Sequence, residues 1–190
     1  LTLGGVGSGT VIENVEIVSN QDDGIEWFGG TVNVKHAIVW NTGDDAIDTD
    51  QSWAGTLDNF IVVNPGDECF ELDGPEGSME ATHTIKNGTV YAGDAEGLVD
   101  LDDNSLVDMM AIYFFGLAEG QDFDLGPEGL TASDLEATIP DGFELTDFFK
   151  EGSDEFVTAV AEMQNTVGAD LAQFQGWSWA AVSGALEELN

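Results

Sequence analysis

Residues 43–50 decide the fold: Gly43-Asp44-Asp45-Ala46-Ile47-Asp48-Thr49-Asp50. A similar phrase lies upstream at residues 22–27 and downstream at 67–73, and weaker copies follow at 98–102 and 122–125. Each copy joins an acidic turn to alternating apolar and acidic residues, and the copies recur about every 22 to 29 positions. A repeat of this length indicates structural units that stack on one another.

Alternation along each copy predicts which side chains form the core, because successive side chains of a β-strand point to opposite faces. If Ile47 points inward, Thr49 does too, and Asp48 points outward. The inward set across the copies is Ile25, Trp27, Ile47, Thr49, Phe70, Leu72, Val99, Leu101, Phe123 and Leu125. The outward set is Glu26, Asp48, Glu71, Asp100 and Asp124. Every outward member is an acid, and only Thr49 of the inward set is polar, so one choice of faces suits all copies.

A second, apolar strand precedes each of the first three acidic phrases and is followed by asparagine at Asn20, Asn41 or Asn64. Asparagine tolerates the left-handed backbone of a sharp corner, so these residues are expected to form a column of turns. Units of this length with two or three short strands predict an all-β fold, a right-handed parallel β-helix of about five coils over residues 1–126. Leucine-rich repeats and β-sandwiches fit less well, since the leucine pattern of the former and the hairpin dipeptides of the latter are missing.

Residues 127–190 differ in character and are expected to form a mixed, partly helical cap. Ser133 and Glu136 have capping-box spacing, and Ser153 is placed to begin a helix over about residues 154–164. The aromatic residues of this region are expected to serve as core. The cap would cover the last coil or run back along the wall of the solenoid.

The charge is extreme, with 38 acidic residues against 3 basic ones and a formal net charge of -35. Nucleic acid and anionic membranes are excluded as partners, because binding them needs clustered lysine or arginine. Self-repulsion opposes folding, so bound divalent cations, a salty medium or both are expected to offset it. The single cysteine, Cys69, takes the repeat position of Gly24 and Ala46, which predicts a small buried residue. The sequence contains no run of 18 apolar residues, so we do not expect direct membrane insertion.

Residues 1–10, 22–36 and 43–50 resemble a large group of uncharacterised bacterial secreted or cell-surface proteins of the Bacteroidetes and marine Gram-negative lipoprotein type. Gly-Trp-Ser-Trp-Ala-Ala at 176–181 is similar to the end of such proteins. The resemblance implies a pectin-lyase-like β-helix and an extracellular or outer cell-surface location, but no agreed activity. Further coils precede the first motif in that group. We therefore expect the first coil to pack on a missing N-terminal β-helix portion or, by self-association, on another copy.

The outward acids predict files of carboxylates along one flank. Adjacent coils lie about 4.8 Å apart, so neighbouring carboxylates raise each other's pKa or recruit a cation. Calcium suits such a surface, because it takes six to eight oxygen ligands. The candidate ligands are Glu26, Asp48, Asp50, Glu71, Asp73, Asp100 and Asp102, and the acidic turn pairs at 22–23, 44–45 and 67–68 form a further column. An acidic face with diffuse counterions remains the alternative.

A carbohydrate-active enzyme is the alternative function, with Asp44, Asp45 and Asp48 as its acids. Two or three carboxylates suffice for glycoside hydrolysis, and Gly43-Asp44-Asp45 resembles the Gly-Asp-Asp element of β-helix polygalacturonases. The Gly-His-Gly and Arg-Ile-Lys elements of that family are absent. A polysaccharide lyase is also disfavoured, because the chain has no arginine and its three lysines are scattered.

These observations favour a non-catalytic structural, adhesive or assembly module over an enzyme. A third possibility is a glycan-binding module that uses an exposed Trp40 or Trp53. His36 and His83 are expected in turns or on the surface, and no phosphate-binding loop or clustered histidine and cysteine ligands stand out.

Overall fold

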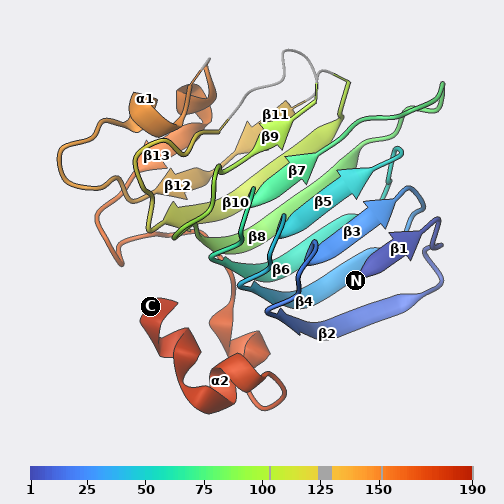
Figure 1. The fold of residues 1–190 in the computed structure, drawn as a ribbon, viewed down its shortest axis with the longest axis horizontal. Helices are drawn as coiled ribbons and strands as arrows, with labels where there is room; N and C mark the ends of the chain where they lie inside the picture. Colours follow the sequence, from blue (N-terminus) through green and yellow to red (C-terminus); the bar gives the residue numbers. More distant parts are fainter. Residues whose placement is uncertain (103, 124–129, 151, 190) are drawn as a thin grey trace.

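The computed structural model describes residues 1–102, 104–123, 130–150 and 152–189. Short strands form one five-stranded sheet: β1 (Thr2–Gly4), β3 (Ile25–Phe28), β5 (Ile47–Asp50), β7 (Phe70–Leu72) and β9 (Asp100–Leu101). The other sheet has eight strands: β2 (Val11–Val18), β4 (Asn33–Trp40), β6 (Thr56–Val63), β8 (His83–Tyr91), β10 (Val107–Phe115), β11 (Leu130–Ser133), β12 (Leu135–Ala137) and β13 (Val157–Ala159). The chain alternates between the two sheets, which Figure 1 shows as stacked rows of arrows.

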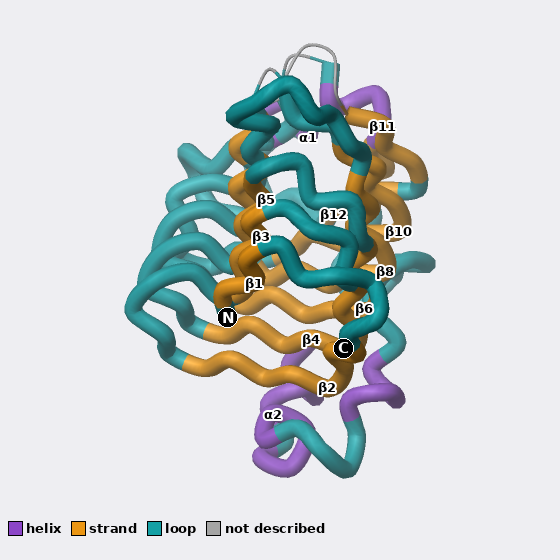
Figure 2. Tube along the Cα trace, turned by 90° about the vertical axis from the view of Figure 1, so that its right-hand side faces the viewer, coloured by secondary structure: helices purple, strands orange, loops and turns teal. Residues whose placement is uncertain are grey.

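The chain winds as a parallel solenoid. Every pairing between these strands is parallel. Up to β10, strands two places apart in the chain are neighbours, from β1 with β3 and β2 with β4 to β8 with β10. Two parallel neighbours must be joined by a crossover connection. For two successive long strands, this connection consists of the short strand and the loops on the other side of the coil. The arrangement has about seven turns and is consistent with the predicted right-handed β-helix, with a small helical C-terminal part. Figure 2 shows the coils stacked along one axis.

The predicted inward faces are confirmed. Ile25, Ile47, Phe70 and Phe123 have no exposed surface, and Thr49 is equally buried among them. The aromatic members pack edge to face, as Phe60 does against Phe70 at a centroid distance of 5.9 Å. Asp124 and Leu125 lie outside the described residues. The core is therefore a continuous apolar file inside the coils.

A column of residues with left-handed backbone bends the long strands, a feature that the repeat pattern alone did not predict. The φ angles are 60° at Asn14, 54° at His36, 60° at Asn59, 59° at Asn87 and 55° at Ala111. The strand pairing skips each of these positions and resumes beyond it. Asparagine adopts the left-handed conformation more readily than most residues, so Asn14, Asn59 and Asn87 were the feature of the sequence that indicated this bend.

The predicted turn column is partly right. Asn41 and Asn64 have positive φ angles of 51° and 54°, and the Asn64 side-chain amide donates to Asn41 Oδ1 at 3.1 Å. The equivalent residue one coil earlier is Ser19, with φ 54°, and not Asn20. Asn20 instead donates its side-chain amide to the carbonyls of Asp22 and Asp23.

The sheet continues past residue 126, where the sequence suggested that the coils end. Ser133 and Glu136 lie in β11 and β12, so the predicted capping-box helix is wrong. The helix expected over residues 154–164 is instead a 3-10 turn, η1 (Ser153–Phe156), followed by β13. The free edge of β10 explains the difference, because ladder hydrogen bonds override a weak local helix preference. The remaining helical segments are α1 (Leu145–Phe148), η2 (Leu171–Phe174), α2 (Trp179–Ser183) and η3 (Ala185–Leu189).

The last segment, residues 166–189, runs back along the outside of the long strands, one of the two predicted courses (Figure 1). We call it the C-terminal strap. Buried Phe174 packs in a cluster with Ile38 and Ile61 of β4 and β6. At the far end, the Glu16 carboxylate accepts from the backbone N–H groups of Trp179 and Ala180 at 2.6 and 2.9 Å. Within the described part of the chain, no helix has the length and apolar character needed to cross a membrane.

Candidate functional site

The short strands align four acids in one row along the outer face. Register pairs Glu26 with Asp48, Asp48 with Glu71 and Glu71 with Asp100. We call these four residues the acid row. Because neighbouring parallel strands lie about 4.8 Å apart, each carboxyl group has an acid above or below it, as the repeat predicts.

A second column of acids follows each short strand. Asp50 ends β5, and the backbone N–H groups of Asp73 and Asp102 donate to the carbonyls of Thr49 and Leu72 one coil earlier. Burial raises the pKa of Asp73 to about 6, and the charges of Asp102, Asp50 and Asp100 add to the shift. The column is therefore present, and its members influence one another.

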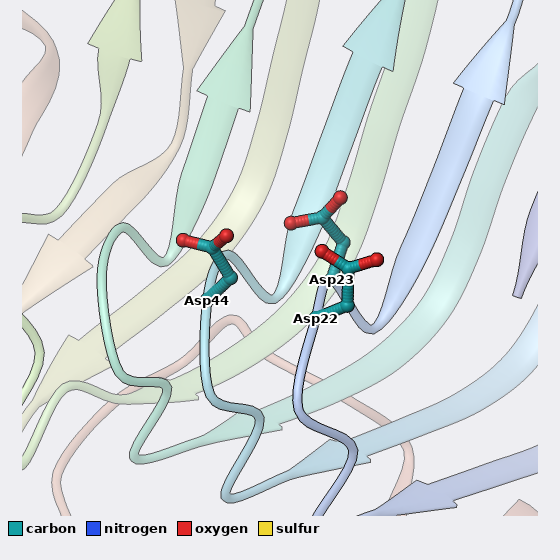
Figure 3. Close-up of side chains that lie close together, drawn as sticks. All are labelled: Asp22, Asp23 and Asp44. Carbon is teal, nitrogen blue, oxygen red and sulfur yellow. The ribbon is translucent and has the colours of Figure 1, made fainter.

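Acidic turns bring further carboxylates onto the row. Among the described residues, three groups have ligand oxygens within 4.8 Å of one another: Asp22, Asp23 and Asp44; Asp23, Glu26 and Asp48; and Asp44, Asp45 and Asp67. Figure 3 shows the first group on the turns that precede β3 and β5. Glu26 and Asp48 are the two predicted ligands that join such a group. Asp50, Glu71, Asp73, Asp100 and Asp102 do not belong to any of the three, whose other members come from the turns.

Asp48 is the most enclosed member of the acid row, with 7% of its surface exposed. Burial raises its pKa to about 8, and the charges of Asp23, Glu26, Asp73 and Asp45 add to the shift. The ion pairs between described side chains are Lys86 with Asp58 and Lys150 with Asp122, so neither neutralises Asp48. A buried carboxylate among other acids favours either a bound proton or a bound cation.

Asp45 forms a pair with an acid of the next coil. Its Oδ1 accepts from the backbone N–H of Glu68 at 2.7 Å, and its carboxyl group is hydrogen-bonded to that of Glu71. Burial is the main cause of the raised pKa of both groups, and it brings that of Glu71 to about 8. Burial likewise raises the pKa of Glu68 to about 8. With raised pKa values, both groups hold a proton more readily than an ordinary carboxyl group does, as a proton donor requires.

The catalytic alternative named Asp44, Asp45 and Asp48. The structure joins Asp44 and Asp45 with Asp67 in one group and places Asp48 in another with Asp23 and Glu26. The contact between Asp45 and Glu71 was missed, because nothing local in the sequence indicates which acids of successive coils touch.

A comparison with known protein families finds one match over residues 1–105, to a domain described as a pectate-lyase-like β-helix. The chain belongs to this family. No curated protein and no solved structure matches it. The matched part of this pectate-lyase-like domain contains β1 to β9 and all three carboxylate groups.

Two residues of the pectate-lyase-like domain that were expected to be exposed, His83 and Trp53, lie inside the coils. His83 was expected in a turn or on the surface, but it is buried, and burial lowers its pKa to about 4. Trp53 is also buried, donates its indole N–H to the Val32 carbonyl at 3.0 Å and packs against His83. Trp53 is therefore not an exposed glycan ligand. Trp53 also stacks on buried Trp27 with ring centroids 4.4 Å apart, so both residues belong to one aromatic stack inside the coils.

Cys69 behaves as predicted, whereas His36 is half-buried within a strand and contacts Phe174. His36 sits at the bend of β4, where its Nδ1 lies 3.2 Å from Asn14 Oδ1. Cys69 is fully buried, and burial raises the pKa of its thiol far above the ordinary range, so it is an inert core residue.

The geometry supports two kinds of chemistry on the acidic face. Groups of three carboxylates provide hard oxygen ligands of the kind that Ca²⁺ prefers. Asp45 with Glu71 provides a pair of acids with raised pKa values, such as a general acid requires.

Proposed function

We propose that this chain is a non-catalytic structural, adhesive or assembly module of a bacterial cell-surface protein or fibre, and that divalent cations stabilise it. The observation that supports this most directly is Asp48, a nearly buried carboxylate grouped with Asp23 and Glu26. These acids come from two adjacent coils, so a bound Ca²⁺ would fasten one coil to the next. It would also relieve the repulsion between them.

The first coil is the proposed assembly surface. β1 and β2 each have a strand neighbour on one side, and Val11 of β2 is 78% exposed. A free strand edge invites pairing with another chain or with further coils. The extracellular or outer cell-surface location rests on the resemblance of residues 1–55 to secreted bacterial proteins. The charge leaves nucleic acid outside the expected partners.

Thermal unfolding in calcium tests the proposed cation binding. We expect millimolar Ca²⁺ to raise the melting temperature above that in sodium chloride of the same ionic strength, because only specific sites distinguish the two salts. Equal melting temperatures would mean that salt merely screens the acids and would refute bound calcium.

A carbohydrate-active enzyme is the second candidate, because Asp45 and Glu71 form a hydrogen-bonded acid pair. A reducing-end release assay on neutral and acidic polysaccharides separates the candidates. We expect no release by the wild-type chain. Release that Asp45→Asn abolishes, in a variant with an unchanged circular dichroism spectrum, would establish the enzyme and overturn the structural proposal.

A further inference from the structure

The face opposite the acid row carries a line of apolar side chains near the ends of the long strands. Register aligns Val18 with Trp40, Trp40 with Val63, Val63 with Tyr91 and Tyr91 with Phe115. We call these five residues the aromatic line. It runs along the solenoid axis at the border of the C-terminal strap. Val63 is buried in the cluster under the strap, and Trp40 and Tyr91 pack against that cluster but stay partly exposed.

Two hollows lie along the aromatic line. One has a volume of about 390 Å³ and is lined by Trp40, Asn41, Val63, Asn64, Tyr91 and Leu189. The other, of about 310 Å³, includes Tyr91, Phe115, Thr138 and Glu162 in its lining. Tyr91 lines both hollows, which we together call the groove. The strap supplies Leu189 at one border, which gives the groove a wall that the sheet alone would lack.

Two of the rings that line the groove, those of Tyr91 and Phe115, are held in place. The Tyr91 ring lies over Gly93 and Gly116, where a Cβ atom would meet ring carbons at 2.9 and 2.2 Å. Tyr91 contacts Phe115 edge to face at 5.2 Å, and Phe115 stacks on Tyr113 with an interplanar angle of 1°. The Tyr113 hydroxyl in turn hydrogen-bonds Thr138 Oγ1 at 2.7 Å. A ligand would therefore meet rigid rings and lose little of its binding energy in ordering them.

The polar groups of the groove indicate the kind of ligand. The Asn64 amide is occupied, since it donates to Asn41 and accepts from the Asp94 N–H. Tyr91 supplies a hydroxyl group and Trp40 an indole N–H, and Glu162 adds acceptor oxygens. A molecule with flat apolar faces and many hydroxyl groups suits such a site. A polyproline peptide also docks on aromatic grooves, but it brings carbonyl acceptors and no backbone N–H donors for Glu162.

We propose that this groove binds a neutral oligosaccharide chain, with sugar rings lying against Trp40 and Tyr91. Two coils separate these residues, about 10 Å, which is a length that two linked pyranose rings span. The net charge of -35 disfavours uronate chains. None of the residues that line the groove belongs to the three carboxylate groups, so this binding does not depend on the proposed cation sites.

Calorimetric titration with cellohexaose, xylohexaose, mannohexaose and laminarihexaose tests the proposal. We expect saturable, millimolar or tighter binding of at least one of them, and weaker binding of hexagalacturonate. Trp40→Ala should lower the affinity about tenfold or more, and Trp40→Phe should restore part of it, because an aromatic face is regained. The matched control is Trp179→Ala, which removes a tryptophan that is 62% exposed and outside the groove; it should bind like wild type.

Each variant's melting temperature shows whether it is folded. Failure of all four neutral hexasaccharides to bind would overturn the proposal, as would unchanged affinity in folded Trp40→Ala. Preference for hexagalacturonate, or binding of decaproline in place of the sugars, would also refute it. Asp48→Asn should leave sugar binding unchanged, so loss of calcium stabilisation and loss of sugar binding are distinguishable.

Discussion

At the scale of single residues, Asp48 shows how the repeat places an acid in a nearly buried position beside other acids. Its neighbours along β5, Ile47 and Thr49, are fully buried on the inner face, so strand geometry turns Asp48 outward. There it meets Glu26 from the coil before it and Asp23 from the turn before that coil's short strand. The resulting repulsion is a local cost that a cation or a proton can relieve.

Replacing this carboxylate tests that reasoning. Without divalent cations and at pH 9, above the raised pKa of Asp48, we expect Asp48→Asn to stabilise the fold by on the order of 1 kcal/mol, because a buried charge among like charges is removed. The same change should reduce the stabilisation by calcium. Thermal unfolding with and without Ca²⁺ measures both effects.

Asp141→Asn provides the control, because Asp141 is exposed and lies outside the three carboxylate groups. It removes the same charge and should leave the calcium effect intact. Equal effects of the two variants would mean that total charge matters and that the site does not.

At the scale of elements, the C-terminal strap is held by polar contacts at intervals and by buried apolar side chains, of which Phe174 is the largest. The Glu136 carboxylate accepts from Thr166 Oγ1 at 2.6 Å, and Asn59 Oδ1 accepts from the Asp170 N–H at 2.7 Å. Between these contacts and Glu16, Phe174 fills the cluster above β4 and β6. The helical segments of the strap are four or five residues long, so they depend on this packing and not on intrinsic helix stability.

Removing the Phe174 side chain should loosen the strap alone. We expect Phe174→Ala to weaken its docking by on the order of 3 kcal/mol, as for other buried aromatic deletions. Hydrogen exchange of residues 169–189 should then quicken, while β3 and β5 keep their protection.

Val182→Ala in the same strap is the control, because Val182 is 78% exposed. In Val182→Ala, hydrogen exchange of residues 169–189 should be as slow as in the wild-type chain. If Phe174→Ala leaves exchange of the strap unchanged, Phe174 does not anchor it.

At the scale of the whole molecule, the shifted carboxyl groups make stability depend on pH. Asp48, Glu68 and Glu71 have pKa values of about 8 in the folded chain, mainly because they are buried, against ordinary values of 3.8 to 4.5. Between these limits the folded state binds more protons than the unfolded state, so the free energy of unfolding falls as pH rises. His83 acts oppositely below 6.5, because burial lowers its pKa to about 4.

The window from pH 6.5 to 8 therefore isolates the carboxyl groups. In calcium-free buffer of constant ionic strength, we expect the melting temperature to rise by roughly 5 °C as pH is lowered from 8 to 6.5. Saturating Ca²⁺ should flatten this dependence, because the bound ion keeps the carboxylates ionised. A melting temperature that is constant or falls on acidification in calcium-free buffer would contradict the shifted pKa values.

The sequence by itself determined the winding and the two faces of the short strands. Residues such as Ile47 and Asp48 alternate with period two and recur at a fixed interval, and both signals are local to the chain. Asn14, Asn59 and Asn87 marked the bend of the long strands as well, although that column was not recognised in advance.

Only the tertiary structure decided which acids touch and where the last third of the chain goes. Asp23 meets Asp48, and Asp45 meets Glu71, because the shape of each turn and the register between coils set their distance. Likewise, β12 joins the sheet at the free edge of β10, and β13 joins at the edge of β12. His83 lies in the core because it packs against Trp53 there. These contacts are non-local, and their energies outweigh the local preferences that a sequence displays.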